Sequence, residues 1–134
     1  MAPPFPALDA STNILIVEDD PHVATFIEEM LADSGMCIAG TASCGVEALS
    51  IATEKQISLA LVDIRLTGPI DGIQLACLLR DNHRVPVVFL SGLVDRETMV
   101  RAQTATPLAF IAKPFRPSLV FNAIERALMA VPPG

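Results

Sequence analysis

The chain contains no tryptophan and no tyrosine, and its aromatic residues are six phenylalanines, 4% of 134 positions. The flat rings that would stack on a flavin are therefore scarce. Basic residues are also few, because nine lysines and arginines stand against fifteen acidic residues and the net charge is −6. Binding of a polyanion relies on a basic surface, so we expect no direct nucleic-acid partner.

Long apolar runs are absent as well. Runs such as Ile14–Val17 and Val87–Leu90 are far shorter than the roughly 18 residues needed to cross a bilayer. The first 13 residues lack the basic start and the apolar stretch of a signal peptide. Three cysteines form no CxxC pair and leave an odd count, which favours free thiols in a reducing cytosol. We therefore expect a cytoplasmic protein with no membrane partner.

Hydrophobic residues make up 51% of the chain and charged residues 18%, a composition typical of one folded globular domain of this length. Prolines near the start and at the end predict a flexible tail over residues 1–12 and a short tail over 131–134, with the domain spanning 13–130. The acidic residues are concentrated, because residues 1–67 hold ten acids and two bases.

Short aliphatic runs alternate with segments of helical periodicity. Capping residues precede several of the helical segments: Asp20-Pro21, Ser43, Asp71 and Asp95. The expected strands are Ile14–Val17, Cys37–Thr41, Ser58–Val62, Val85–Leu90 and Leu108–Ala112. This alternation predicts an α/β fold: a doubly wound, flavodoxin-like (βα)5 domain with a five-stranded parallel sheet of order 2-1-3-4-5 and helices on both faces.

Polar side chains follow four of these strands. They are Glu18, Asp19 and Asp20 after the first, Asp63 after the third, Ser91 after the fourth and Lys113 after the fifth. In the expected strand order these strand ends are neighbours, so the side chains converge on one edge of the sheet. Singly, each residue has an ordinary structural explanation. Asp20 is most simply the helix N-cap, with membership of an acidic pocket as its alternative role.

Clustered carboxylates have chemical consequences. Two of them about 4 Å apart repel by roughly 4 kcal/mol at an effective dielectric constant of 20, so the cluster raises a pKa or recruits a cation. Oxygen ligands favour Mg²⁺, with Mn²⁺ as the alternative. One carboxylate can then act as a nucleophile and form an acyl phosphate, with Lys113 and Ser91 contacting the phosphoryl oxygens.

These motifs together resemble the receiver domain of bacterial two-component response regulators, in its single-domain, chemotaxis-receiver-like form. The resemblance covers residues 13–130 through ILIVEDDP, LVDIRL, FLSG and FIAKPF, in that order and spacing. It implies that Asp63 accepts a phosphoryl group from a histidine kinase or a histidine phosphotransfer protein. It also implies that Asp19, Asp63 and the backbone carbonyl of Arg65 bind Mg²⁺ directly, and that Glu18 acts through a metal-bound water.

The resemblance further implies that Ser91 is the switch hydroxyl, that Lys113 contacts the phosphoryl group and that the Lys113-Pro114 bond is cis. Phe110 matches the aromatic residue that turns inward, although ordinary packing between sheet and helix explains it too. Arg65 and Leu93 occupy positions that influence attack by water on the phosphoryl group in this family.

Two segments depart from the family pattern. The loop over residues 66–72 is one residue longer and has Gly68 where proline is frequent, which leaves the loop geometry open. The stretch over 103–107 lacks the usual Gly-Ala before the fifth strand. We expect no output domain after residue 130 and no enzymatic activity beyond self-phosphorylation and slow autodephosphorylation.

Signalling in such a domain relies on a changed surface around the fourth helix, the fifth strand and the fifth helix. That region holds Arg96, Arg101, Arg116 and Arg126, which suit an acidic downstream partner or a homodimer. Their presence is explained equally well if they are ordinary solvent-exposed charges on helix surfaces. The sequence names neither the downstream target nor the cognate kinase.

Three other readings remain open. A haloacid-dehalogenase-type phosphatase also places Asp after a strand, but its second aspartate is replaced here by Arg65. A flavodoxin-like electron carrier shares the sheet order but needs a Ser/Thr-rich phosphate loop that this chain does not have after its first strand. A degenerate receiver would bind partners without being phosphorylated.

Overall fold

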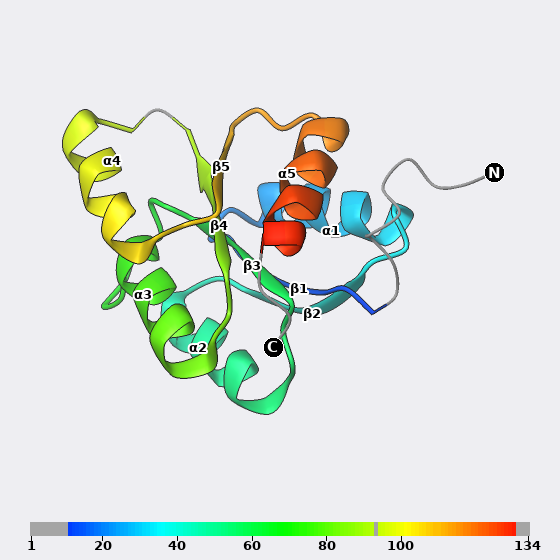
Figure 1. Ribbon diagram of the computed structural model, residues 1–134, viewed down its shortest axis with the longest axis horizontal. Coiled ribbons are helices and arrows are strands. Elements are labelled where there is room, and N and C mark those ends of the chain that lie inside the picture. Colours follow the sequence, from blue (N-terminus) through cyan, green and yellow to red (C-terminus); the bar gives the residue numbers. More distant parts are fainter. Residues whose placement is uncertain (1–10, 93, 131–134) are drawn as a thin grey trace.

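The computed structural model describes residues 11–92 and 94–130, in which strands and helices alternate along the chain (Figure 1). The elements are β1 Asn13–Val17, α1 Pro21–Asp33, β2 Cys37–Ala42, α2 Gly45–Glu54, β3 Leu59–Asp63, α3 Gly72–His83, β4 Val87–Ser91, α4 Arg96–Ala102, the 3-10 turn Gln103–Ala105, β5 Ala109–Ala112 and α5 Pro117–Ala130. None of the helices in these residues is long and apolar enough to cross a membrane.

The strands form one parallel sheet of order β2-β1-β3-β4-β5, which confirms the predicted α/β architecture. Parallel neighbours need crossover connections, and the helices supply them on both faces. Figure 1 shows α1 and α5 on one side of the sheet and α2, α3 and α4 on the other. Because the chain leaves β1 toward β2 and later returns to β3 on the opposite side, β1 and β3 lie at the topological switch point where ligands bind in such sheets.

Alternation along the central strands divides the core into two layers. Ile14 and Ile16 face the layer covered by α1 and α5, whereas Leu15 and Val17 face the layer covered by α2 and α3. All four side chains are fully buried. A strand buried on both faces must be apolar at every position, which is why these runs stand out in the sequence.

Capping residues begin α1, α3 and α4 where the sequence predicts. Asp20 accepts a hydrogen bond from the backbone N–H of His22 at 2.9 Å, and Asp95 accepts one from Thr98 at 2.7 Å. Asp71 and Gln74 form a capping box at the start of α3. These bonds satisfy backbone donors that the first helical turn leaves without a partner.

The predicted cap of α2 is wrong by one residue. The N-cap is Cys44, in an extended conformation and without a side-chain cap hydrogen bond, rather than Ser43. The first residue of α2 also lies close to the loop over residues 66–71, since a methyl group at Gly45 would lie 3.0 Å from the Cβ of Ile70.

Several strand boundaries also differ from the prediction by one or two residues. β4 begins at Val87 rather than Val85, because Pro86 has no N–H to donate to the ladder. β3 and β4 extend one residue further than expected, so Asp63 and Ser91 are the last residues of their strands rather than the first residues after them. Regular strand geometry therefore holds both residues in place.

Candidate functional site

The polar residues predicted from the strand ends lie together at one edge of the sheet. Val17 pairs with Val62, Asp63 pairs with Leu90, and Ser91 pairs with Ala112. The residues that end or follow β1, β3, β4 and β5 are therefore adjacent in space. The tertiary structure brings Glu18, Asp19, Asp63, Ser91 and Lys113 to this edge.

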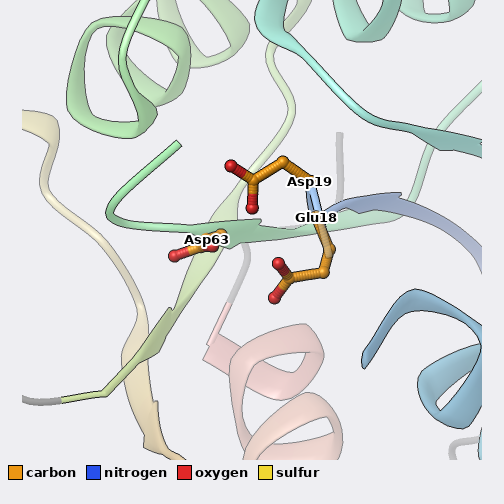
Figure 2. Close-up of side chains that lie close together, drawn as sticks. All are labelled: Glu18, Asp19 and Asp63. Carbon is orange, nitrogen blue, oxygen red and sulfur yellow. The ribbon is translucent and has the colours of Figure 1, made fainter. Parts of the chain in front are cut away.

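Three carboxylates form a compact cluster. One oxygen each from Glu18, Asp19 and Asp63 lies within 4.8 Å of the others. Figure 2 shows Glu18 and Asp19 leaving the end of β1 on opposite sides, with Asp63 at the end of the neighbouring β3. Glu18 and Asp63 are buried, at 2% and 6% exposure, whereas Asp19 is open to solvent. Two buried acidic groups at such short range require a compensating positive charge.

Lys113 supplies that charge. Its Nζ lies 2.9 Å from Oε1 of Glu18 and 3.6 Å from Oδ2 of Asp63. The backbone N–H of Lys113 donates to the carbonyl oxygen of Ser91 at 2.7 Å, which ties the lysine to the end of β4. The Lys113-Pro114 peptide bond is cis, as the resemblance implies. One ammonium group thus serves two carboxylates from different strands.

Backbone N–H groups orient the two buried carboxylates. The N–H of Asp20 donates to Oε2 of Glu18 at 3.1 Å, and the N–H of Arg65 donates to Oδ1 of Asp63 at 2.9 Å. In both side chains the second oxygen faces Lys113. Each carboxylate is therefore held from two sides, which restricts its rotation.

The loop after β3 contributes a contact that sequence reasoning missed. The hydroxyl of Thr67 donates to Oδ2 of Asp19 at 3.3 Å, across 48 positions of the chain. Gly68 follows with a φ of +111°, in the left-handed region, and a methyl group there would meet nothing within 4 Å. The extra length of this loop thus requires glycine for backbone conformation rather than for space. The loop's position after Asp63 is the signal that would have pointed to Thr67.

Electrostatics at the site follow from burial and crowding. Burial raises the pKa of the Glu18 carboxyl above its usual 4.5, and repulsion from Asp63 adds to the rise, against the hydrogen bond from Lys113. Burial alone would lower the pKa of Lys113, but its hydrogen bond to Glu18 and the charge of Asp63 outweigh this and raise the pKa. Lys113 is accordingly protonated at neutral pH. Three carboxylates around one ammonium leave an excess of negative charge.

The donor set fits a hard divalent cation. The atoms available within the cluster are carboxylate oxygens, which Mg²⁺ prefers, and no thiol or imidazole belongs to it among the residues described. The excess negative charge gives a second reason for a cation. The chemistry of Glu18, Asp19 and Asp63 is therefore compatible with the predicted metal, while the backbone carbonyl of Arg65 stays a predicted ligand.

The side chain of Asp20 does not belong to the cluster of Glu18, Asp19 and Asp63. Its side chain is exposed and accepts the cap hydrogen bond from His22. Of the two roles considered for it, the structure shows the cap of α1.

Ser91 and Phe110 occupy the strands where the resemblance places the switch residues. Ser91 is 7% exposed and ends β4. Phe110, in β5, is half-buried and its ring lies 5.7 Å from that of Phe89 at an interplanar angle of 32°. This packing is what an ordinary core ring would show, so its part in a switch stays a prediction. Leu93, the second residue expected to influence attack by water, lies outside the described residues, as do 1–10 and 131–134.

Gly72 lets α3 start directly against the end of β3. A methyl group at this position would overlap the carbonyl oxygen of Asp63 and lie 2.9 Å from that of Ile64. We expect Gly72→Ala to lower the free energy of unfolding by about 1–3 kcal/mol, because the backbone of β3 cannot move aside without disturbing the sheet. Urea titration of the variant measures this.

Gly92→Ala is the matched control, because a methyl group at Gly92 meets nothing within 4 Å. Its unfolding free energy should stay within ~0.5 kcal/mol of the parent. Alanine is the better helix former, so a stabilised Gly72→Ala variant would show that the close approach to Asp63 does not matter.

In a comparison with known protein families, the sequence model of the response regulator receiver domain matches residues 14–125 of this chain. Among curated proteins, the phyllosphere-induced regulator PhyR of Methylorubrum extorquens is 35% identical over 123 residues, which are 91% of this chain and 45% of that protein. This chain spans about half the length of PhyR and of the transcriptional regulatory protein PdtaR of Mycobacterium tuberculosis, another curated relative that it matches.

Solved structures of similar fold agree with this match. The signal receiver domain of a modulated diguanylate cyclase from Desulfovibrio desulfuricans superposes with a TM-score of 0.84 at 32% identity, covering 87% of this chain and 93% of that one. The receiver domain of a sensor histidine kinase from Pseudomonas aeruginosa, solved with a magnesium ion coordinated in its active site cleft, gives a TM-score of 0.79 at 27% identity, covering 89% and 98%.

Proposed function

This chain belongs to the response regulator receiver domain family, and from that premise we propose that Asp63 is its phosphoacceptor, with Lys113 as the residue that contacts the incoming phosphoryl group. The observation that carries the proposal is the position of the Lys113 ammonium, 2.9 Å from Glu18 and 3.6 Å from Asp63 at the sheet edge. A phosphatase of the haloacid dehalogenase type and an electron carrier are both less compatible with the family match.

The proposed reaction transfers a phosphoryl group from the imidazole nitrogen of a phosphohistidine. A carboxylate oxygen of Asp63 attacks phosphorus, the P–N bond breaks, and the nitrogen keeps the electron pair and is protonated. The product is an acyl phosphate on Asp63. Water later attacks the phosphorus and releases inorganic phosphate, which restores the carboxylate.

Each neighbouring group has a role in this reaction. Lys113 would neutralise charge on the phosphoryl oxygens, and the N–H of Arg65 holds one oxygen of Asp63 so that the other is presented. Asp19 and Asp63 would hold the Mg²⁺ ion, with Glu18 assisting through a water. When bound, Mg²⁺ would neutralise the acidic cluster and stabilise the negative charge of the transferred group.

The donor would be a histidine kinase or a histidine phosphotransfer protein, and the exchange would take place in the cytoplasm. The free thiols of Cys44 and Cys77 are compatible with a reducing compartment. The chain would act as a signalling domain whose own catalysis is limited to phosphoryl transfer to Asp63 and slow hydrolysis of the resulting acyl phosphate.

The signal would leave through the surface of α4, β5 and α5. A phosphoryl group adds about −1.5 to −2 charges beside Ser91, whose hydroxyl would move toward it, and Phe110 would follow by repacking. The downstream protein or a second copy of this chain would then bind the changed surface. Of the arginines in this region, Arg101 is already engaged in an ion pair with Asp71.

Incubation with a small acyl phosphate donor tests the proposed function directly. With Mg²⁺ present, the protein should gain the mass of one phosphoryl group, and peptide mapping should locate it on Asp63. Excess chelator should suppress the reaction, because the acidic cluster then repels the anionic donor. A protein that stays unmodified with an active donor and Mg²⁺ would be a degenerate receiver, contrary to the proposal.

A further inference from the structure

Helix α4 is fixed to the rest of the domain by few contacts. Of its residues Arg96–Ala102, Ala102 is buried, Met99 is partly buried against the core and Val100 is 64% exposed. A helix with so small a buried surface gains little stability from packing. Polar contacts at its ends therefore contribute to its position beside these two side chains.

The polar contact to α3 is an ion pair. Nη2 of Arg101 lies 3.0 Å from Oδ2 of Asp71, while Oδ1 of Asp71 accepts the cap hydrogen bond from the N–H of Gln74. Partial burial would raise the pKa of Asp71, but the bonds from Gln74 and Arg101 outweigh it and lower the pKa. Asp71 is thus ionised and shared between the start of α3 and the end of α4.

Asp71 also adjoins the phosphoacceptor strand. The next residue, Gly72, lies against the carbonyl oxygen of Asp63. The ion pair therefore joins α4 to the segment that directly follows the acceptor. A second contact reinforces it, because Nη1 of Arg80 in α3 donates to the carbonyl oxygen of Thr104 at 2.8 Å.

The two ends of α4 are consequently attached to different parts of the site. Four residues, 92–95, separate Ser91 at the end of β4 from the start of α4. The end of α4 is held to the start of α3 by Arg101. A displacement of Ser91 toward Asp63 would reach the start of α4 through this short connection, while the ion pair would resist it at the other end.

We propose that the Asp71–Arg101 ion pair is a latch that holds α4 in the position it has without a phosphoryl group, and that breaking it favours the phosphorylated conformation. This inference rests on the proposed function of Asp63. An exposed ion pair has a small effect, so we expect the equilibrium to shift about two- to fivefold.

Binding of beryllofluoride, a phosphoryl mimic, in the presence of Mg²⁺ tests the latch by calorimetry. Arg101→Gln and Asp71→Asn should each bind the mimic about two- to fivefold more tightly than the parent. Asparagine keeps the cap of α3, so Asp71→Asn removes the ion pair alone. The double variant should bind no more tightly than either single variant, because the latch is already broken.

The directions in which the two single variants change their affinity for the mimic distinguish a latch from long-range electrostatics. Loss of a positive charge should weaken binding of an anion, and loss of a negative charge should strengthen it, so long-range effects move the two single variants in opposite directions. Arg96→Gln is the control in the same helix, because Arg96 forms no salt bridge within the described part of the chain. The affinity of this variant for the mimic should not rise. Unchanged affinities or opposite shifts would overturn the latch.

Hydrogen exchange distinguishes failure of the latch from failure of the proposed function. If the parent does not bind the mimic, the phosphoacceptor role fails. The ligand-free variants then still report on the latch, because amides of residues 96–102 should exchange about two- to fivefold faster in Arg101→Gln and Asp71→Asn than in Arg96→Gln. Equal exchange in all three variants would show that the ion pair does not hold α4.

Discussion

Asp63→Asn should gain no phosphoryl group under conditions that fully modify the parent. A carboxamide cannot attack phosphorus as a carboxylate does, and the variant also loses one of the predicted Mg²⁺ ligands. The side chain keeps its shape, so the N–H of Arg65 retains an oxygen acceptor and the fold should be preserved. Intact-mass spectrometry after incubation with donor and Mg²⁺ measures the loss, which should be complete.

Asp20→Asn is the matched control for this substitution. It makes the same chemical change two residues from Glu18, at an exposed residue whose role is to cap α1. Asparagine caps helices as well as aspartate does, so phosphorylation should continue near the parental rate. Modification of Asp63→Asn at the parental rate would place the acceptor elsewhere, and peptide mapping would identify it.

Lys113→Met should destabilise the protein at neutral pH. It leaves the carboxylates of Glu18 and Asp63 buried without the ammonium that lies 2.9 Å and 3.6 Å from them. The side chain of Lys113 is 28% exposed, and water can partly replace it. We therefore expect a loss of about 1–3 kcal/mol at pH 7, below the roughly 3–5 kcal/mol of a fully buried pair. Urea unfolding in metal-free buffer measures it.

The loss of unfolding free energy in Lys113→Met should become smaller as the pH falls. Burial already raises the pKa of Glu18 above 4.5, and removing Lys113 takes away an interaction that lowers it. The folded variant then binds more protons than the unfolded chain at pH values above 4.5, so its stability decreases as the pH rises through this window. The difference from the parent should be smaller at pH 5 than at pH 7.

The double variant Glu18→Gln/Lys113→Met supplies the control. It removes both charges of the shorter ion pair, so no carboxylate of Glu18 is left without a partner and much of the lost stability should return. Two outcomes would contradict this explanation: an equal loss of stability at pH 5 and pH 7, or a double variant no more stable than Lys113→Met. Either would mean that lost packing, rather than an unpaired carboxylate, destabilises the variant.

Most residues of the candidate site could be predicted from the local sequence. Glu18, Asp63 and Lys113 each follow or end an apolar run, and an apolar run marks a buried strand. Once the runs are ordered as parallel neighbours, their ends must meet. The residues at those ends were therefore predictable, although their roles in phosphoryl transfer stay proposals.

Other features depended on the path of the chain in the tertiary structure. The N-cap of α2 is Cys44 rather than the predicted Ser43, and Gly45 beside it packs against Ile70 of the loop over residues 66–71. The contact of Thr67 with Asp19 depends on the path of a loop whose length was noted but whose conformation was left open. In the stretch before β5, where the family's Gly-Ala is missing, Thr106 adopts a left-handed conformation with a φ of +46°.

The sequence by itself determined the order of the strands and helices, the parallel sheet and which polar residues lie at the carboxyl edge of that sheet. It could do so because burial on both faces of a strand and on one face of a helix leaves a periodic pattern in neighbouring residues. The tertiary structure alone decided which charges meet. Lys113 reaches Glu18 across 95 positions and Arg101 reaches Asp71 across 30, and such pairs depend on crossovers and loop paths that no local pattern encodes.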